Sequence, residues 1–132
     1  MTITRFAIAS VGAFIFISLY EMLVHVFLMA DFYHQTASVW RSPEESSMPI
    51  MLLSQGLFAA ALAFFYPIVG LDNECKKGLP FGFGLGLVMA MPQIGTYSYL
   101  PIPLTLSLLW AAIVFVEVIC ASFIISKIYN WE

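Results

Sequence analysis

Apolar residues fill four long stretches of this chain, and three short polar segments separate them. Each stretch approaches the roughly 20 apolar residues that a helix needs to cross a hydrocarbon layer about 30 Å thick. A backbone inside lipid has no water to bond, so the expected structure is a helix, which satisfies its own backbone groups. The pattern predicts four transmembrane helices, at residues 4–29, 48–69, 80–99 and 103–128.

The polar segments support these boundaries. Ser47 is a good helix-capping residue before the second stretch, and Pro49 suits a first helical turn. The segment 31–48 is too polar to cross the membrane, but Tyr33, Trp40 and Arg41 favour a position at the membrane surface. We therefore predict one all-α, polytopic domain over residues 1–132, with a short interfacial segment between its first and second helices.

Composition makes the bilayer the expected solvent. The chain is 61% hydrophobic and 10% charged, whereas a soluble domain has about 25% charged residues. Its net charge of −3 comes with no basic run, so we expect no nucleic-acid partner. The two cysteines lie far apart and form no C-x-x-C pair, which argues against a disulfide framework or a zinc site. We expect no cofactor.

The basic residues indicate an orientation. Four of the five share one side of a four-helix arrangement: Arg5, Lys76, Lys77 and Lys127. Arg41 alone falls on the other side. Because cytoplasmic loops are enriched in Lys and Arg, both termini and the 71–80 loop are expected in the cytoplasm. The 31–48 segment then faces the outside.

Two ionisable residues stand inside the first span, in "LYEMLVHVF" at residues 19–27. Glu21 and His25 are four positions apart and share one helix face. At a rise of 1.5 Å per residue, Glu21 lies about 24 Å above Arg5, near the level expected for Gln55 and Gln93. Two interpretations stay open: Glu21, in its protonated form, bonds to Gln55 and Gln93 and so joins the helices, or the residues line an outer-facing polar cavity that binds a proton, a cation or a polar ligand group.

Glu117 is the second acid within a span. It is expected about 15 Å from the depth of Glu21, so a direct pair is not predicted. A neutral carboxyl bonded to Tyr66 or Ser122 is one interpretation. A step on a proton or cation path is the other, although no ionisable residue is expected between the two acids.

A metal site can be assembled only loosely from the sequence. His25, His34 and Asp31 all fall near the outer face, and imidazole and carboxylate are common metal ligands. Their spacing matches no metal motif, so we favour no metal. No G-x-S-x-G segment or similar nucleophile setting is present, and we predict no enzyme activity.

Small residues mark two helix faces. Gly82 and Gly86 form a G-x-x-x-G pair, and Ala59 and Ala63 form a similar pair on the second helix. Such faces let two backbones approach closely. The sequence leaves open whether the partner helix belongs to this chain or to another protein.

The run "LYEMLVHVFLMADFYHQTASVWRSPEE", followed by a Pro-started second helix and a Gly-rich third, resembles small four-helix bacterial membrane proteins of the domain-of-unknown-function type. The resemblance implies a bacterial inner-membrane setting and brings no activity. We predict an accessory or scaffold subunit that associates with other membrane proteins or with itself. The alternative is a small carrier or sensor built on Glu21 and His25.

Overall fold

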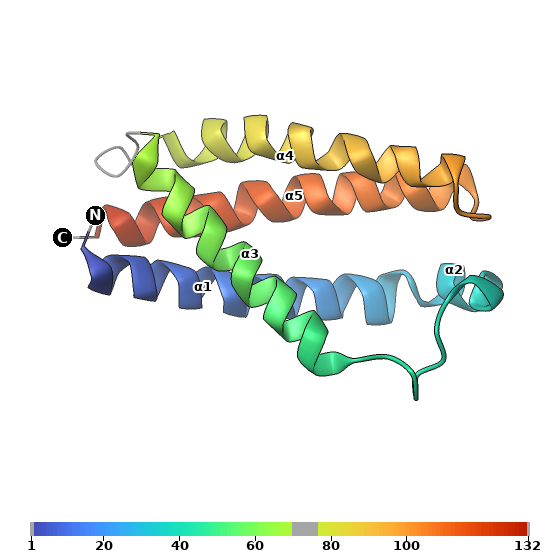
Figure 1. Ribbon diagram of the computed structural model, residues 1–132. Coiled ribbons are helices and arrows are strands. Elements are labelled where there is room, and N and C mark those ends of the chain that lie inside the picture. Colours follow the sequence, from blue (N-terminus) through green and yellow to red (C-terminus); the bar gives the residue numbers. More distant parts are fainter. Residues whose placement is uncertain (1, 70–76, 132) are drawn as a thin grey trace.

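A computed structural model describes residues 2–69 and 77–131, and the chain is helical throughout these ranges apart from short connections (Figure 1). The elements follow in the order α1 (Ile3–Glu21), η1 (Met22–Leu28), α2 (Ala30–Gln35), η2 (Ala37–Val39), α3 (Met48–Ile68), α4 (Gly78–Gly95), η4 (Thr96–Ser98) and α5 (Leu104–Tyr129). Most of the polar loop expected at 71–80, including Lys76, lies outside the described residues.

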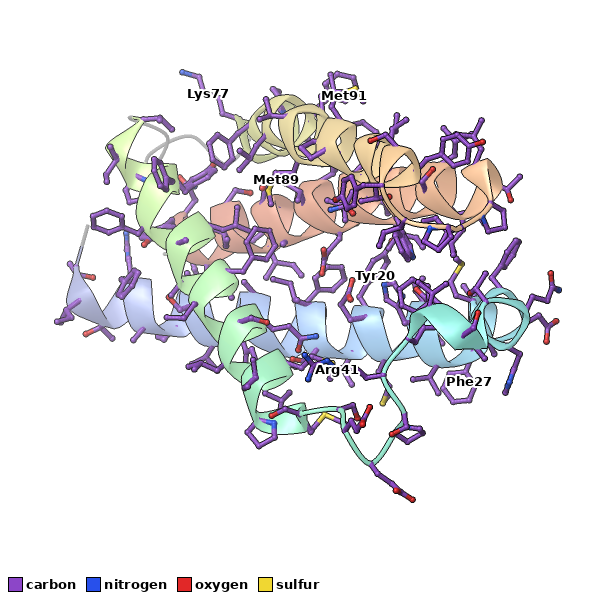
Figure 2. The ribbon with its side chains drawn as sticks, turned by 45° about the vertical axis from the view of Figure 1, so that its right-hand side comes forward. Tyr20, Phe27, Arg41, Lys77, Met89 and Met91 are labelled. Carbon is purple, nitrogen blue, oxygen red and sulfur yellow. The ribbon has the colours of Figure 1, made fainter. Side chains whose placement is uncertain are left out.

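Four helical stretches are long and apolar enough to cross a membrane: Ile3–Leu28, Met48–Ile68, Gly78–Ser98 and Leu104–Tyr129. Their ends differ by no more than two residues from the predicted spans. At most 33% of the most apolar window of any span is buried inside the protein, so most of its side chains face outward. Phe27 and Met91, for example, project away from the bundle in Figure 2. The prediction of an all-α protein with four potential membrane spans is confirmed.

The first span departs from a uniform α-helix at its C-terminal end. Residues Met22–Leu28 form a π-helix, η1, whose wider turn bonds each N–H to a carbonyl five residues back. The Met29 N–H, for instance, donates to the Val24 carbonyl at 2.9 Å. A π-helical turn is rare and often occurs at a functional site. His25 lies within it.

The helices do not form a regular four-fold bundle. In Figure 1, α4, α5 and α1 run side by side, and α3 crosses this layer obliquely. α4 packs on α5, and α1 packs on both α5 and α3. Both termini lie at one end, where the Arg5 guanidinium donates to the carbonyls of Tyr129 at 3.0 Å and Trp131 at 3.2 Å. The molecule therefore has a terminal end and an opposite end, here called the far end.

Near the terminal end, small residues bring α1 and α3 into close contact. Ala9 and Ala13 of α1 and Ala59 and Ala63 of α3 are fully buried in one core cluster. The Tyr129 hydroxyl of α5 donates to the Ala63 carbonyl at 2.9 Å. The small-residue face of α3 is thus occupied by helices of the same chain.

The glycine face of α4 packs against α5. A Cβ placed on Gly82 would lie 2.8 Å from the Ile119 Cα, and one on Gly86 would lie 3.1 Å from the Phe115 carbonyl oxygen. Both distances are shorter than ordinary van der Waals contact, so only glycine fits there without a shift of α5. The sequence left open whether the partner of the glycine face belongs to this chain or to another protein. The partner is α5 of the same chain.

Candidate functional site

Two cavities lie toward the far end, beside Glu21 and His25. The larger, of about 710 Å³, is lined by Glu21, His25, Tyr33, Trp40, Ser46, Met51, Gln93, Trp110, Ile113 and Val114. The smaller, of about 520 Å³, lies between α1 and α3 and shares Glu21, His25 and Met51 with the larger. These cavities form because α3 crosses α1 obliquely, so its first turns do not lie along α4 (Figure 1). The acid and the imidazole therefore border both cavities.

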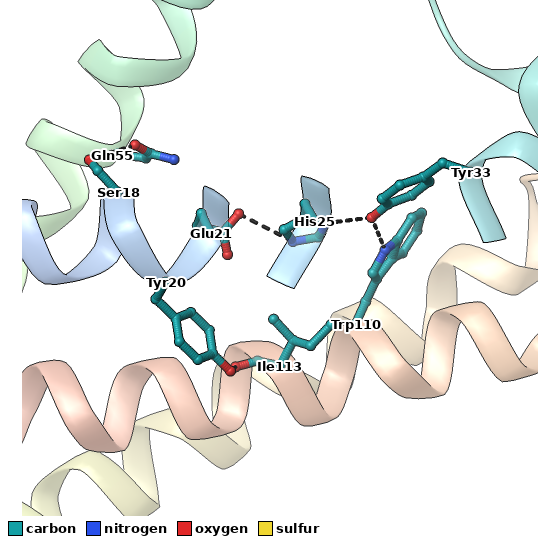
Figure 3. Close-up of polar contacts among 8 residues, drawn as sticks. All are labelled: Ser18, Tyr20, Glu21, His25, Tyr33, Gln55, Trp110 and Ile113. Atoms are coloured by element: carbon teal, nitrogen blue, oxygen red, sulfur yellow. Dashed lines mark hydrogen bonds and ion pairs between the residues drawn. The ribbon is translucent and has the colours of Figure 1, made fainter. Parts of the chain in front are cut away.

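A chain of polar contacts begins at Glu21 and ends at Trp110 (Figure 3). Oε2 of Glu21 lies 3.2 Å from Nε2 of His25, one turn further along the helix. The other ring nitrogen, Nδ1, lies 2.5 Å from the hydroxyl of Tyr33 on α2. The indole N–H of Trp110 on α5 donates to the same hydroxyl at 2.8 Å. The consecutive elements α1, η1 and α2 and the distant helix α5 thus supply one connected site.

The hydrogen-bonding capacity of each group limits where the protons can lie in the contacts from Glu21 to Trp110. Because an indole N–H only donates, the Tyr33 oxygen must accept from Trp110. With a neutral imidazole, Tyr33 then donates to Nδ1, and the ring N–H at Nε2 faces the Glu21 carboxylate. With a protonated imidazole, both ring nitrogens donate and the Tyr33 oxygen accepts twice. The same atomic positions are compatible with either charge state of His25.

Tyr33 is suited to remain a neutral phenol. Burial raises the pKa of its hydroxyl, the nearby Glu21 carboxylate raises it further, and the hydrogen bond from Trp110 opposes these effects. The net direction is upward, so Tyr33 keeps its hydrogen at neutral pH and is available as a donor to His25.

Aromatic packing holds the site in place. The Trp40 ring meets Tyr33 edge-on at 5.6 Å between ring centroids and meets Trp110 at 5.7 Å. The indole N–H of Trp40 donates to the Thr36 hydroxyl at 2.9 Å, so it is satisfied without a hydrogen bond to His25, Tyr33 or Trp110. Tyr33 and Trp40, which the sequence placed at the membrane interface, pack onto α5 as walls of the larger cavity. Arg41 is exposed.

The two glutamines of the expected polar layer border the site separately. Gln55 is buried and lines the smaller cavity, where its Oε1 accepts from the Ser18 hydroxyl at 2.9 Å. Gln93 lines the larger cavity. Among the described residues, no hydrogen bond joins Glu21 to either glutamine. The three side chains gather around shared cavities, but they do not form the direct hydrogen-bond bridge between helices that we considered.

Glu117 takes no part in the contacts from Glu21 to Trp110, and only 5% of its surface is exposed. Within the described part of the protein, neither its Oε1 nor the Ser122 hydroxyl has a hydrogen-bond partner, so these two groups do not bond as one interpretation expected. Tyr20 lies within electrostatic range of both Glu21 and Glu117. Its hydroxyl donates to the Ile113 carbonyl at 3.0 Å. Tyr20 is thus an ionisable residue that interacts electrostatically with both acids.

The metal candidates do not converge. Nowhere in ranges 2–69 and 77–131 do three or more His, Cys, Asp or Glu side chains gather closely enough to hold a metal ion. Asp31 and His34 are exposed on α2, while His25 points into the site.

Sequence reasoning missed the roles of Tyr33 and Trp110 in this site. Tyr33 was expected at the membrane surface, and Trp110 is 77 residues away from it in sequence. The available signal was depth, because Trp110 falls near the level of Glu21 when residues are counted along the spans. Depth alone does not show which side of a helix faces the site.

Comparison with protein-family models, with curated proteins and with solved structures gave no match. The resemblance to small bacterial membrane proteins therefore stays a prediction, and the functional argument rests on the geometry of the site.

Proposed function

We propose that the protein is a membrane-embedded carrier or sensor whose working site is the contact chain from Glu21 through His25 and Tyr33 to Trp110. One observation carries the proposal: an acid and an imidazole inside a span are linked to each other and border two cavities. Ionisable side chains within a membrane span are energetically unfavourable and commonly serve transport or sensing.

Proton binding at His25 is the elementary event of the proposal. A neutral imidazole leaves the Glu21–His25 pair with one negative charge, and a protonated imidazole makes it neutral. Tyr33 then changes from donor to acceptor toward Nδ1, and its hydrogen must find another acceptor. Because Tyr33 belongs to α2, the event reaches a segment outside the spans.

The proposed setting is the bacterial inner membrane, with both termini in the cytoplasm and the site toward the outer face. The distribution of Lys and Arg supports this orientation. Under it, α2 and the loop before α3 lie outside, and His25 exchanges protons with the external side.

Association with other membrane proteins stays a prediction. The small-residue faces first suggested for it pack within this chain. Gly82 and Gly86 pack on α5, while Ala59 and Ala63 are buried within the chain. An accessory role therefore needs a different face, and none of the contacts described here indicates which. This is why we prefer the carrier or sensor.

Tryptophan fluorescence between pH 5 and 8 tests the proposal, since imidazole ordinarily titrates in this range. Protonation of His25 is expected to change the emission of Trp110, because Tyr33 links the two. His25→Gln should remove this transition, whereas His34→Gln, on the exposed outer segment, should retain it. Trp131, at the terminal end, should be replaced by Phe in all samples to remove its background. A transition that persists in His25→Gln, or one that His34→Gln also abolishes, would contradict the proposal.

A further inference from the structure

We infer that the two cavities bind an organic monocation with apolar groups, and that this cation exchanges with the proton on His25. The inference rests on the proposed function, because it assigns a ligand class to the same site. It follows from the size, charge and chemistry of the lining.

Size indicates a molecule larger than a simple ion. The cavities measure about 710 and 520 Å³, within the range of roughly 300–1,000 Å³ typical of small-molecule sites. Glu21, His25 and Met51 line both cavities, so a guest in either cavity can contact Glu21 and His25. The Glu21 and His25 side chains are 27% and 30% exposed, which leaves both within reach of a guest.

Charge favours a cation. Glu21 is the only acidic side chain among the described residues that line the cavities, and no Lys or Arg is among them. Its contact with His25 uses Oε2, and Oε1 makes no hydrogen bond to another described residue. An anionic guest would meet this carboxylate with no basic side chain to compensate, so anions are disfavoured.

The remaining lining suits an organic cation better than a metal ion. Tyr33, Trp40 and Trp110 form an aromatic wall of the larger cavity, and aromatic faces attract ammonium-type cations. Met51, Ile113 and Val114 provide apolar contact area. A metal ion needs several converging polar ligands, and the described residues supply no such group.

Exchange with the proton follows from the position of the acid. A bound cation and a protonated His25 would place two positive charges beside one carboxylate, so each disfavours the other. Tyr33 on α2, Tyr20 on α1 and Glu117 on α5 are titratable groups that interact electrostatically with Glu21, and none of them gains a positive charge. Helices α3 and α4 contain no Asp, Glu, Lys, Arg or His, and Arg41 of the outer loop is exposed. His25 is thus the only neighbouring group that gains a positive charge.

Tetraphenylphosphonium binding to the purified full-length protein in a nonionic detergent tests the inference. Tetraphenylborate, an anion of nearly the same shape, controls for partition into the micelle. We expect saturable binding of the cation only. Its affinity should rise with pH, by at most about tenfold per pH unit, because each cation bound to protein with a protonated His25 releases one proton.

Variants assign the effect to residues. Glu21→Gln should weaken binding at least tenfold, and Asp31→Asn, on the exposed surface of α2, should leave it unchanged. Met51→Trp enlarges a side chain that lines both cavities without altering charge, and it should also weaken binding at least tenfold. His25→Gln should still bind the cation but release no proton. Thermal unfolding of each variant verifies that it is folded.

Three results would overturn the inference: equal binding of the cation and the anion, undiminished binding by folded Glu21→Gln, or unchanged proton release by His25→Gln. The proposed function fails separately, through loss of the difference between His25→Gln and His34→Gln in the fluorescence titration. A protein that shows that difference but binds no tetraphenylphosphonium retains its proton site and refutes only the ligand class.

Discussion

At the scale of single residues, the Tyr33 hydroxyl has a central position in the site. It accepts from the Trp110 indole at 2.8 Å and meets Nδ1 of His25 at 2.5 Å. Because the indole only donates, Tyr33 can face the imidazole as donor or as acceptor. A phenylalanine at this position would keep the ring but leave Trp110 and Nδ1 without their shared partner.

The raised pKa of Tyr33 predicts its behaviour in alkali. In the unfolded chain this phenol is expected to ionise near pH 10. In the folded protein it should ionise above that pH, because burial disfavours the phenolate. The stabilisation linked to this shift is complete below about pH 10 and is lost as pH rises through the raised pKa.

Ultraviolet titration near 295 nm, taken as the difference between wild type and Tyr33→Phe, measures this phenol alone among the six tyrosines. A difference transition at or below the pH found in urea-unfolded protein would show that Tyr33 is not buried as described.

At the scale of elements, α4 depends on residues that lack a side chain. Gly78, Gly82, Gly86 and Ala90 are buried at intervals of four and form one smooth face against α5. Gly84 points elsewhere: a Cβ placed on it would have no described atom outside its own helix within 4 Å. A substitution at Gly84 is therefore a control, on the same helix, for a substitution at Gly82.

We expect Gly82→Ala to destabilise the protein by about 1–3 kcal/mol, because its methyl group must displace backbone atoms of α5. Gly84→Ala should be neutral or stabilising by about 0.5–1 kcal/mol, since alanine favours a helix over glycine. Thermal or denaturant unfolding in detergent measures both. Equal effects of the two substitutions would contradict the packing of α4 on α5.

At the scale of the whole molecule, the two ends differ. Buried alanines bring α1 and α3 together near the terminal end, while the oblique course of α3 leaves cavities toward the far end. The Arg5 side chain joins the first and last helices at the terminal end. Cavities that Glu21 and His25 border toward the far end suit a protein that receives a ligand from one side of a membrane.

The proposed orientation predicts the outcome of reporter fusions. Alkaline phosphatase, which is active only after export, should be active when inserted at Pro43 and inactive when fused at the C-terminus. A fluorescent protein that folds in the cytoplasm should be bright at the C-terminus. The reverse pattern would place the cavities toward the cytoplasm and would change the source of the proton, but not the chemistry of the site.

Much of the fold was predictable because lipid imposes a simple rule on the backbone. The length and apolarity of each stretch located the four helices, and a fixed rise per residue placed Glu21, Gln55 and Gln93 at neighbouring levels. The site was predictable only in part. Its acid and imidazole are four residues apart, so helical spacing pairs them, whereas Tyr33 lies beyond the π-helical turn of η1.

The sequence by itself determined four apolar helices, a pair of small-residue faces and an acid–imidazole pair within a span. Local periodicity and the cost of unpaired backbone groups in lipid are sufficient for those conclusions. Only the tertiary structure decided that Gly82 meets α5 of the same chain and that Trp110 reaches Tyr33. It also decided that Glu21 borders cavities, because these features depend on the crossing of α3 and on which side of each helix faces another, and helix length specifies neither.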